Sequence, residues 1–499
     1  MRDFCRWMVV CVLTMLLAAA GLSAGTLGRR LIEAAKTENY ELVKDLLAQG
    51  SDVNVRLPDG GTALHWATYR DSAEITGLLI GAGASVNAEN DYGVTPLGLA
   101  CENGSPALVA LLLRAGADPN HARVTGETSL MTCARTGNLD TVRDLVAHGA
   151  DINAREPWND QTALMWAVGE RHLSVARSLI EHGADVNARS KAGFTTLLLA
   201  ARVEAARALV ELLLDYDADV NVMSLDGTTP LLVAAVRGNV PAALELLKRG
   251  ADPNAGASSG YLPLHWAAGS WHTELTGDLR GIATSGDTEW RSLNGVETGK
   301  LELVNALLAY GADPNSRLVR EPPQFGFASR RFRVNLVGAT PFSLAAMDGN
   351  VAVMRALSDA GADPALGTSE NTTPLMLAAG LGRVPAETRV SEKQSLESIR
   401  FLLPLVDDLN QMNDAGRTAL HGAAHIRSDA VVRLLVEHGA VVNVTDKRGI
   451  SPLMIAEGGG HILLPGLGGG STAELLRELG GATSARGSFI EVYRDGPIR

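Results

Sequence analysis

Short apolar segments recur along this chain at a nearly constant spacing, with a polar turn between them. The clearest marker is an Asn that closes a Gly-Ala-Asp-Val-Asn string or a close variant. This marker stands at Asn54, Asn87, Asn120, Asn153, Asn187, Asn221 and Asn254, and the position returns at Asn315, Ala365, Asn410 and Asn443. Most neighbouring markers are 33 or 34 residues apart, and three longer intervals imply three insertions. The chain is therefore predicted to be an array of similar structural repeats.

The residue types within each repeat predict two short helices. A Thr precedes an apolar run and is often followed by Pro, as in Thr95-Pro96 and Thr340-Pro341. Thr caps the free N–H groups of a helix start, and Pro fits the next position because it has no N–H to leave unpaired. A second apolar run then ends at a Gly such as Gly116, which suits a left-handed helix end.

A period of 33 residues with helix openings such as Thr62-Ala63-Leu64-His65 resembles the ankyrin repeat, a turn followed by two antiparallel helices. The resemblance covers about residues 27–480. It implies an all-α solenoid of about twelve helix-turn-helix repeats, in which neighbours stack into one continuous core. It also implies a concave surface, lined by turns and first helices, that holds another protein.

The same comparison of strings suggests how the chain is divided. We expect a signal peptide at 1–24, an N-terminal capping repeat at 27–54, loop insertions at about 269–296, 316–337 and 382–396, a C-terminal capping repeat at 451–480 and a polar tail at 481–499.

The first residues are typical of an export signal. Arg2 and Arg6 precede an apolar run from Trp7 to Ala20, and small residues continue to Ala24. Cleavage after Ala20 or Ala24 is expected, and an uncleaved membrane anchor is the alternative. After cleavage we expect no stable membrane insertion.

The N-glycosylation acceptor pattern bears on which exported compartment the chain enters. Asn443 begins such a pattern but occupies the recurring marker position, where a glycan would disturb stacking. This favours a bacterial periplasm over the eukaryotic secretory path, with an extracellular location as a further alternative.

Composition narrows the remaining possibilities. Aromatic residues make up only 4% of 499 residues, so the core must consist mainly of Leu, Ala and Val. The net charge of -12 excludes a surface that is wholly a nucleic-acid footprint. Four Cys rule out a disulfide scaffold, and two of them lie in the expected signal. We expect Cys101 and Cys133 to pack as buried small residues, since a bridge would need an oxidising compartment and Cα atoms within about 7 Å.

The recurring histidines are expected to stabilise the fold and not to bind a metal or take part in catalysis. His65, His265 and His421 each stand three places after the helix-opening residue, where the ring can reach back to the cap. Equivalent residues of neighbouring repeats lie about 10 Å apart, too far to share a metal at about 2 Å. No nucleophile is paired with a base. We therefore expect no cofactor, no metal and no enzymatic activity.

The predicted function is a non-catalytic scaffold that binds another protein through the concave groove and the loop insertions. We expect the array to be a monomer. Three Trp share one repeat position, either as framework aromatics or as partner anchors, and other candidates occupy turn tips and helix ends. The candidate residues are Trp66, Tyr69, Arg70, Tyr92, Arg135, Trp158, Trp166, Glu170, Phe194, Arg237, Tyr261 and Trp266, with Arg330, Arg331 and Arg333 in the second insertion.

The second insertion also supports an alternative function. Arg317, Arg320 and the three Arg at 330, 331 and 333 stand near Phe325, Phe327 and Phe332. Interleaved Arg and Phe could stack on nucleic acid, but an exported acidic protein argues against that partner. A polyanion or small ligand bound by this Arg-rich finger, residues 317–333, is the alternative to protein binding.

Overall fold

The computed structural model describes residues 26–203, 206–256, 260–269, 299–320, 334–383, 390–458 and 470–482. The expected signal peptide, most of the first insertion, the centres of the other two and nearly all of the tail lie outside these residues. The chain divides into two compact units, Met1–Leu225 and Asp226–Arg499.

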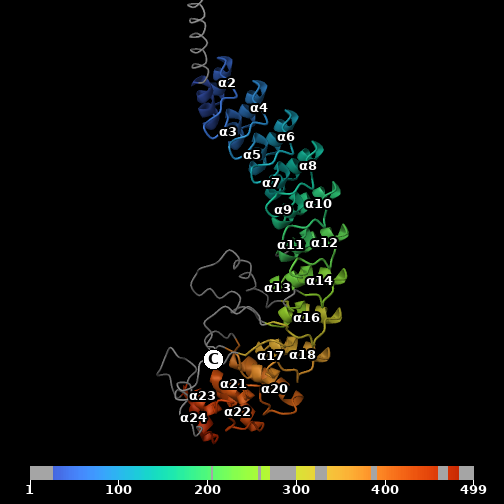
Figure 1. Cartoon of the computed structure of the whole chain (residues 1–499), viewed down its shortest axis with the longest axis vertical. Coiled ribbons are helices and arrows are strands. Elements are labelled where there is room, and N and C mark those ends of the chain that lie inside the picture. The colour runs from blue at the N-terminus through green and yellow to red at the C-terminus, as the bar shows by residue number, and fades with distance from the viewer. Residues whose placement is uncertain are drawn as a thin grey trace, which may run out of the picture. The chain divides into compact units, whose positions relative to one another are not determined.

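Unit 1 consists of helical hairpins in which first helices pack on first helices and second helices on second helices (Figure 1). A helix at 26–36 opens the unit. The further first helices are α3 (Ala63–Tyr69), α5 (Pro96–Asn103), α7 (Ser129–Thr136), α9 (Ala163–Gly169) and α11 (Thr196–Arg202). The second helices are α2 (Tyr40–Ala48), α4 (Ala73–Gly81), α6 (Pro106–Arg114), α8 (Leu139–Ala147), α10 (Leu173–Glu181) and α12 (Arg207–Asp215).

Unit 2 repeats this two-layer arrangement. Its first helices are α13 (Pro230–Arg237), α15 (Pro263–Ala268), α17 (Pro341–Met347), α19 (Pro374–Ala378), α21 (Ala419–Ile426) and α23 (Pro452–Gly458). Its second helices are α14 (Val240–Lys248), α16 (Lys300–Ala309), α18 (Val351–Asp359), α20 (Glu392–Leu402) with the 3-10 turn η2 (Leu403–Leu405), α22 (Asp429–Glu437) and α24 (Ser471–Glu478). Among the described residues every element is helical, apart from one isolated bridge between Ala122 and Thr128. The predicted helical solenoid is confirmed.

The helices begin and end as their residue types predict. The Thr95 hydroxyl accepts a hydrogen bond from the Gly98 N–H at 3.2 Å, and Pro96 takes the first helical position of α5. Gly116, after α6, has a φ of +87°. This left-handed conformation costs Gly little and lets the chain turn into the next repeat.

The recurring Asn ties each repeat to the next. The Asn87 side-chain amide donates to the Gly116 carbonyl at 3.1 Å, and its oxygen accepts from the Asp118 N–H at 2.8 Å. The same pair of bonds joins Asn254 to Gly311 (2.8 Å) and Asp313 (2.9 Å), although these residues lie on either side of the first insertion. A ladder of side-chain to backbone bonds therefore sets the stacking of the repeats.

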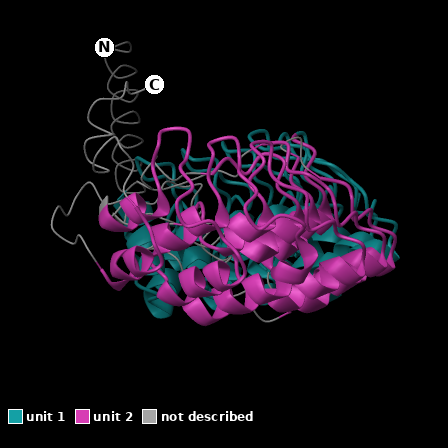
Figure 2. Cartoon of the chain, turned by 90° about the horizontal axis from the view of Figure 1, so that it is seen from below, with its two compact units in different colours: residues 1–225 teal, residues 226–499 magenta. Residues whose placement is uncertain are grey.

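The core of each unit is continuous because equivalent residues stack. Leu64, Leu97 and Leu130 each lie two places after a capping Thr, and all are at most 1% exposed. Burying one such side chain contributes roughly 1.5–3 kcal/mol. The turns project together from one edge of the helical layers in each unit (Figure 2).

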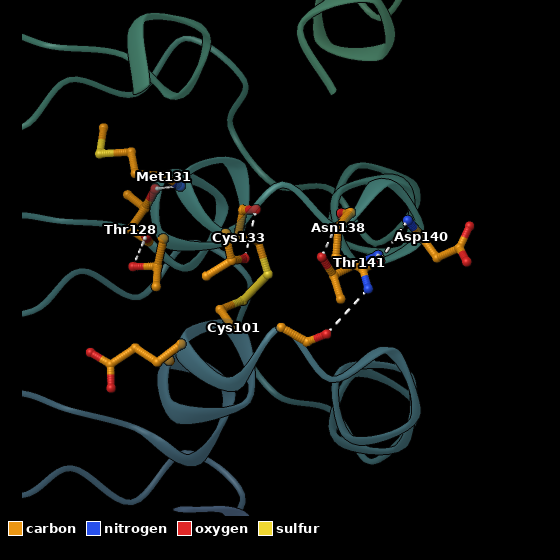
Figure 3. The surroundings of a disulfide bond; sticks show 12 residues. Cys101, Thr128, Met131, Cys133, Asn138, Asp140 and Thr141 are labelled. Atoms are coloured by element: carbon orange, nitrogen blue, oxygen red, sulfur yellow. Dashed lines mark hydrogen bonds between the residues drawn. A yellow bond between two sulfur atoms is a disulfide. The ribbon is translucent and has the colours of Figure 1, made fainter. Parts of the chain in front are cut away.

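The two cysteines of the array are joined. Cys101 in α5 and Cys133 in α7 form a disulfide with Cα atoms 4.7 Å apart (Figure 3). Both residues are fully buried. The expectation that they pack as separate small residues is wrong, because the stacking of α5 on α7 brings these two positions face to face.

Candidate functional site

The turns of unit 1 are joined to one another through their backbones. The Asp91 N–H donates to the Asp59 carbonyl at 2.9 Å, and the Lys191 N–H donates to the Asn159 carbonyl at 2.8 Å. Gly93 is required for this close approach, because a Cβ at that position would lie 2.8 Å from the Val124 nitrogen. The projecting turns therefore form a connected edge and not a set of independent loops.

Large apolar side chains are exposed at these turns. The exposed fraction is 71% for Tyr92, 75% for Val124, 70% for Trp158 and 80% for Leu225. Tyr92 and Trp158 are among the binding residues predicted from the sequence, whereas Val124 and Leu225 are not. A large apolar residue two places before the turn glycine, Gly126 or Gly227, was the signal that could have found them.

A buried carboxylate holds the turn that presents Trp158. Glu156 is only 4% exposed. Its carboxylate accepts hydrogen bonds from the N–H groups of Trp158 (2.7 Å), Asn159 (2.9 Å) and Gln161 (3.1 Å). Three charge-assisted bonds to the turn fix its backbone, so the exposed indole is carried on a rigid support.

Two half-buried indoles lie on the first helices, each covered by a cation from the preceding repeat. The Lys36 ammonium lies 4.9 Å from the centre of the Trp66 ring, and the Tyr69 ring meets Trp66 edge-on at 5.8 Å. The Arg135 guanidinium lies 5.4 Å from the centre of the Trp166 ring. Cation–π contacts of this kind contribute about 0.5–1 kcal/mol at exposed sites. Each indole is therefore covered by one cation; Lys36 over Trp66 is half-buried, and Arg135 over Trp166 is exposed.

The remaining predicted residues of unit 1 differ in exposure. Tyr69, Arg70, Arg135 and Glu170 are exposed, and Phe194 is half-buried. The Arg70 side chain is held in place because its Nε donates to the Lys36 carbonyl at 3.0 Å.

The two aromatic candidates of unit 2 are buried. This contradicts the exposure expected for Tyr261 at a turn tip, whereas for Trp266 it fits the framework alternative. Tyr261 and Trp266 are each only 7% exposed, with ring centres 5.8 Å apart. The two rings pack on one another and are buried, so neither is available to a partner as placed here. Arg237 is half-buried. Arg330, Arg331 and Arg333 lie outside the described residues.

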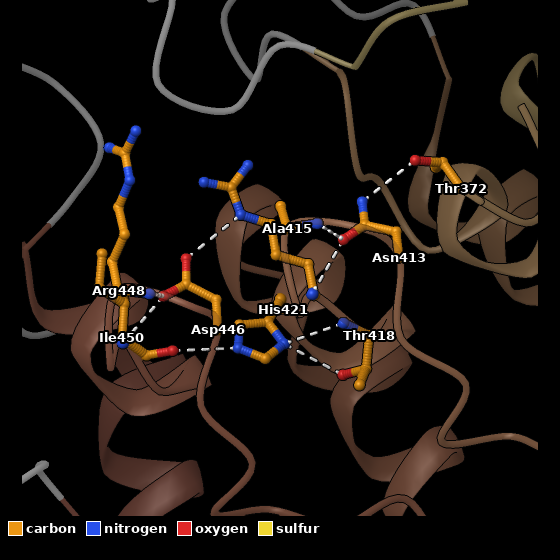
Figure 4. A network of polar contacts seen from close by, with 9 residues as sticks. Thr372, Asn413, Ala415, Thr418, His421, Asp446, Arg448 and Ile450 are labelled. Carbon is orange, nitrogen blue, oxygen red and sulfur yellow. Dashed lines mark hydrogen bonds and ion pairs between the residues drawn. The ribbon is translucent and has the colours of Figure 1, made fainter. Parts of the chain in front are cut away.

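The three repeat histidines serve the fold. In α21 the Thr418 N–H donates to His421 Nδ1 at 3.1 Å, and His421 Nε2 contacts the Ile450 carbonyl at 3.1 Å (Figure 4). Because a carbonyl only accepts, Nε2 carries a proton. Nδ1 accepts from the Thr418 N–H and therefore carries none, so the ring is neutral. Burial lowers the pKa of His421 and of His265 to about 4, and lowers the pKa of His65. These rings are hydrogen-bonded connectors between repeats.

A buried ion pair lies beside His421. Arg417 Nε is 3.4 Å from Asp446 Oδ2, and both side chains are buried. Asp446 Oδ1 also accepts from the N–H groups of Arg448 (2.9 Å) and Ile450 (3.0 Å). Figure 4 shows Asp446 between the turn of its own repeat and the preceding repeat. This network closes the turn before α23 and belongs to the stacking.

Within the described ranges, no group of three or more His, Cys, Asp or Glu side chains is arranged to hold a metal ion. No helix in this described part of the chain is both long enough and apolar enough to cross a bilayer.

Comparison with known proteins agrees with the helical pairs and their ladder. A family model described as "Ankyrin repeats (3 copies)" matches residues 31–123, 116–190, 191–276 and 389–464, which together exceed half of the chain. The chain belongs to the ankyrin repeat family. Ankyrin repeats generally mediate binding between proteins.

Two known proteins illustrate the similarity of this ankyrin repeat chain. YahD of Escherichia coli (strain K12), which is named as an ankyrin repeat protein, is 30% identical over 193 residues, covering 32% of this chain and 85% of YahD. The crystal structure of the human ASB11 ankyrin repeat domain is 29% identical, with a TM-score of 0.40, covering 45% of this chain and 98% of that domain.

Proposed function

We propose that this ankyrin repeat protein is a non-catalytic scaffold that binds another protein through one edge of unit 1. The surface consists of the turn residues Tyr92, Val124 and Trp158 with Tyr69 at the end of α3, and is called here the unit 1 finger surface. The observation that carries the proposal is the exposure of Tyr92, Val124 and Trp158, at 70–75%, on turns that are themselves rigidly held. Exposed apolar groups that gather on one edge are typical of interaction sites.

The residue types favour a protein partner over a polyanion. Tyr and Trp supply large contact areas with few rotatable bonds and dominate binding hot spots. The charges nearby are mixed, since the exposed Arg70 and Arg135 are accompanied by the exposed Glu170. A polyphosphate would meet repulsion from such a carboxylate, whereas a protein surface can match both signs.

The proposal includes export to a bacterial periplasm. The basic and apolar residues at 2–20 support export. The Asn443 side chain supports the bacterial compartment, because its amide donates to the Gly480 carbonyl at 2.8 Å and its oxygen accepts from the Ala482 N–H at 2.7 Å. A glycan attached to the Asn443 side-chain nitrogen would disrupt its hydrogen bond to the Gly480 carbonyl and separate the last two repeats.

Replacing Tyr69, Tyr92 and Trp158 together by Ala is expected to lower partner capture at least about tenfold, since hot-spot aromatics each contribute on the order of 1–2 kcal/mol. Capture from an extract of exported proteins, quantified by mass spectrometry, measures this. Tyr216→Ala is the matched control, because Tyr216 is a partly exposed tyrosine of unit 1 that follows a second helix. Undiminished capture by the triple variant would contradict the proposal.

A second arm of this experiment addresses the Arg-rich finger. Arg317 and Arg320, the part of it that is described, are exposed. A variant with Arg330→Glu, Arg331→Glu and Arg333→Glu should retain the partner if the unit 1 finger surface is the binding site. The polyanion would be favoured by a different pair of results. The Glu variant would lose binding only at low salt, and the triple Ala variant would retain binding.

A further inference from the structure

The disulfide replaces a pair of small residues that the array uses elsewhere. Cys101 lies six places after its capping Thr, and Cys133 five places after the next. The equivalent positions at the following interface are Ala134 and Ala167, both fully buried. A buried alanine pair is thus sufficient for packing between first helices. Two cysteines at this one interface therefore add something that packing does not require.

We propose that the Cys101–Cys133 bond is a permanent lock made during maturation of the exported chain, and not a reversible redox switch. Both residues are 0% exposed in the folded unit. Thiol–disulfide exchange requires an attacking thiolate to reach a sulfur atom, and no external molecule can do so while α5 and α7 are stacked. The bond must therefore form before these two helices close, and it is shielded afterwards.

The oxidant is an external disulfide, carried by a protein oxidase or by a small molecule. One cysteine thiolate attacks it, forms a mixed disulfide and releases one thiol. The thiolate of the second cysteine then attacks the first cysteine's sulfur and releases the other thiol. Two electrons and two protons pass from the chain to the external disulfide, which ends as two thiols. Such oxidants act in oxidising compartments, so this inference rests on the proposed export but not on the proposed partner.

The lock acts on the part of unit 1 that carries the unit 1 finger surface. The closed loop between the two cysteines contains α6 and the turn with Val124, whose N–H contacts the Tyr92 carbonyl at 3.4 Å. Repeat arrays open locally because each repeat contacts only its neighbours. A covalent tie between α5 and α7 prevents opening at this interface and so keeps the turns at Tyr92 and Val124 in register.

The experiment begins with the full chain, alkylated in denaturant without reductant and analysed by mass spectrometry of the peptides that contain Cys101 and Cys133. No alkylation of either residue is expected. A reductant should leave the bond intact in the folded protein and break it rapidly in denaturant. Two free thiols, or equal rates of reduction in the two states, would overturn the proposal. Neither measurement depends on a variant that must fold.

The double variant C101A/C133A tests what the lock does. It recreates the alanine pair of the next interface, so its packing should be preserved. Hydrogen exchange of the α5 and α7 amides is expected to become several hundredfold faster, roughly the change that loss of a cross-link between residues 32 positions apart predicts. Exchange that stays as slow as in the native chain would show that the bond locks nothing. Cell fractionation reports export separately. A bridged chain found in the cytosol would overturn the proposed export and, with it, formation of the bond during export, whereas an exported chain with free thiols would overturn the lock and leave the export standing.

Discussion

Lowering the pH from 7 to 4 is expected to destabilise the repeats around His265 and His421 by about 3 kcal/mol each. Burial lowers the pKa of both rings to about 4, against an ordinary value of 6.5 in the unfolded chain. Between these two values the unfolded chain binds a proton that the folded repeats exclude. The stabilisation is therefore complete above about pH 6.5, is lost as the pH falls, and reaches its minimum near pH 4.

Hydrogen exchange of α15 and α21 across this pH range measures the effect repeat by repeat. His421→Met is the matched control, because the chain itself places Met165 and Met376 at the same position after the capping Thr. This variant should lose the pH dependence at α21 and retain it at α15. A native profile at α21 that stays flat from pH 7 to 4 would contradict the assignment of a buried neutral ring.

Asp446→Ala is expected to lower the free energy of unfolding of the last repeats by about 3–5 kcal/mol, the usual cost of removing one partner of a buried ion pair. The substitution takes away the carboxylate that faces Arg417 and both acceptor bonds to the turn. Denaturant unfolding, with exchange in α21 and α23 as the local readout, measures the loss.

Asp446→Asn separates the charge from the turn. Asn413 closes the preceding turn with the same geometry, since its Oδ1 accepts from the Ala415 N–H at 3.1 Å and the Arg417 N–H at 2.9 Å. An Asn at 446 should therefore keep the turn bonds and cost clearly less than Ala. A loss below about 1 kcal/mol for the Ala variant would show that the buried pair is dispensable.

Much of the fold could be predicted from sequence because it depends on local rules repeated many times. The capping Thr, the Pro that follows it and the left-handed Gly each act within one turn of helix, and the structure shows all three. The 33-residue period then leaves stacking as the way to bury the apolar faces. The family assignment confirms this interpretation.

Features that depend on contacts between repeats were harder to predict. Cys101 and Cys133 stand at different positions of their repeats, six and five places after the cap, so only the stacked helices reveal that they meet. Tyr261 was expected at an exposed turn tip, but the ring turns inward onto Trp266 in a repeat where Leu262 replaces the capping Thr. The roles of the candidate binding residues stay predictions.

The ladder between Asn254 and Gly311 has a consequence for how such a chain can change. The hydrogen bond from the Asn254 side-chain amide to the Gly311 carbonyl, at 2.8 Å, joins residues 57 positions apart. It is equivalent to the bond from Asn87 to Gly116, which joins residues 29 positions apart. Added sequence within a repeat thus leaves the spine of the array unaltered. New recognition segments can be acquired or discarded at such places over evolutionary time, and a protein engineer could graft foreign loops there, without redesigning the helices that carry them.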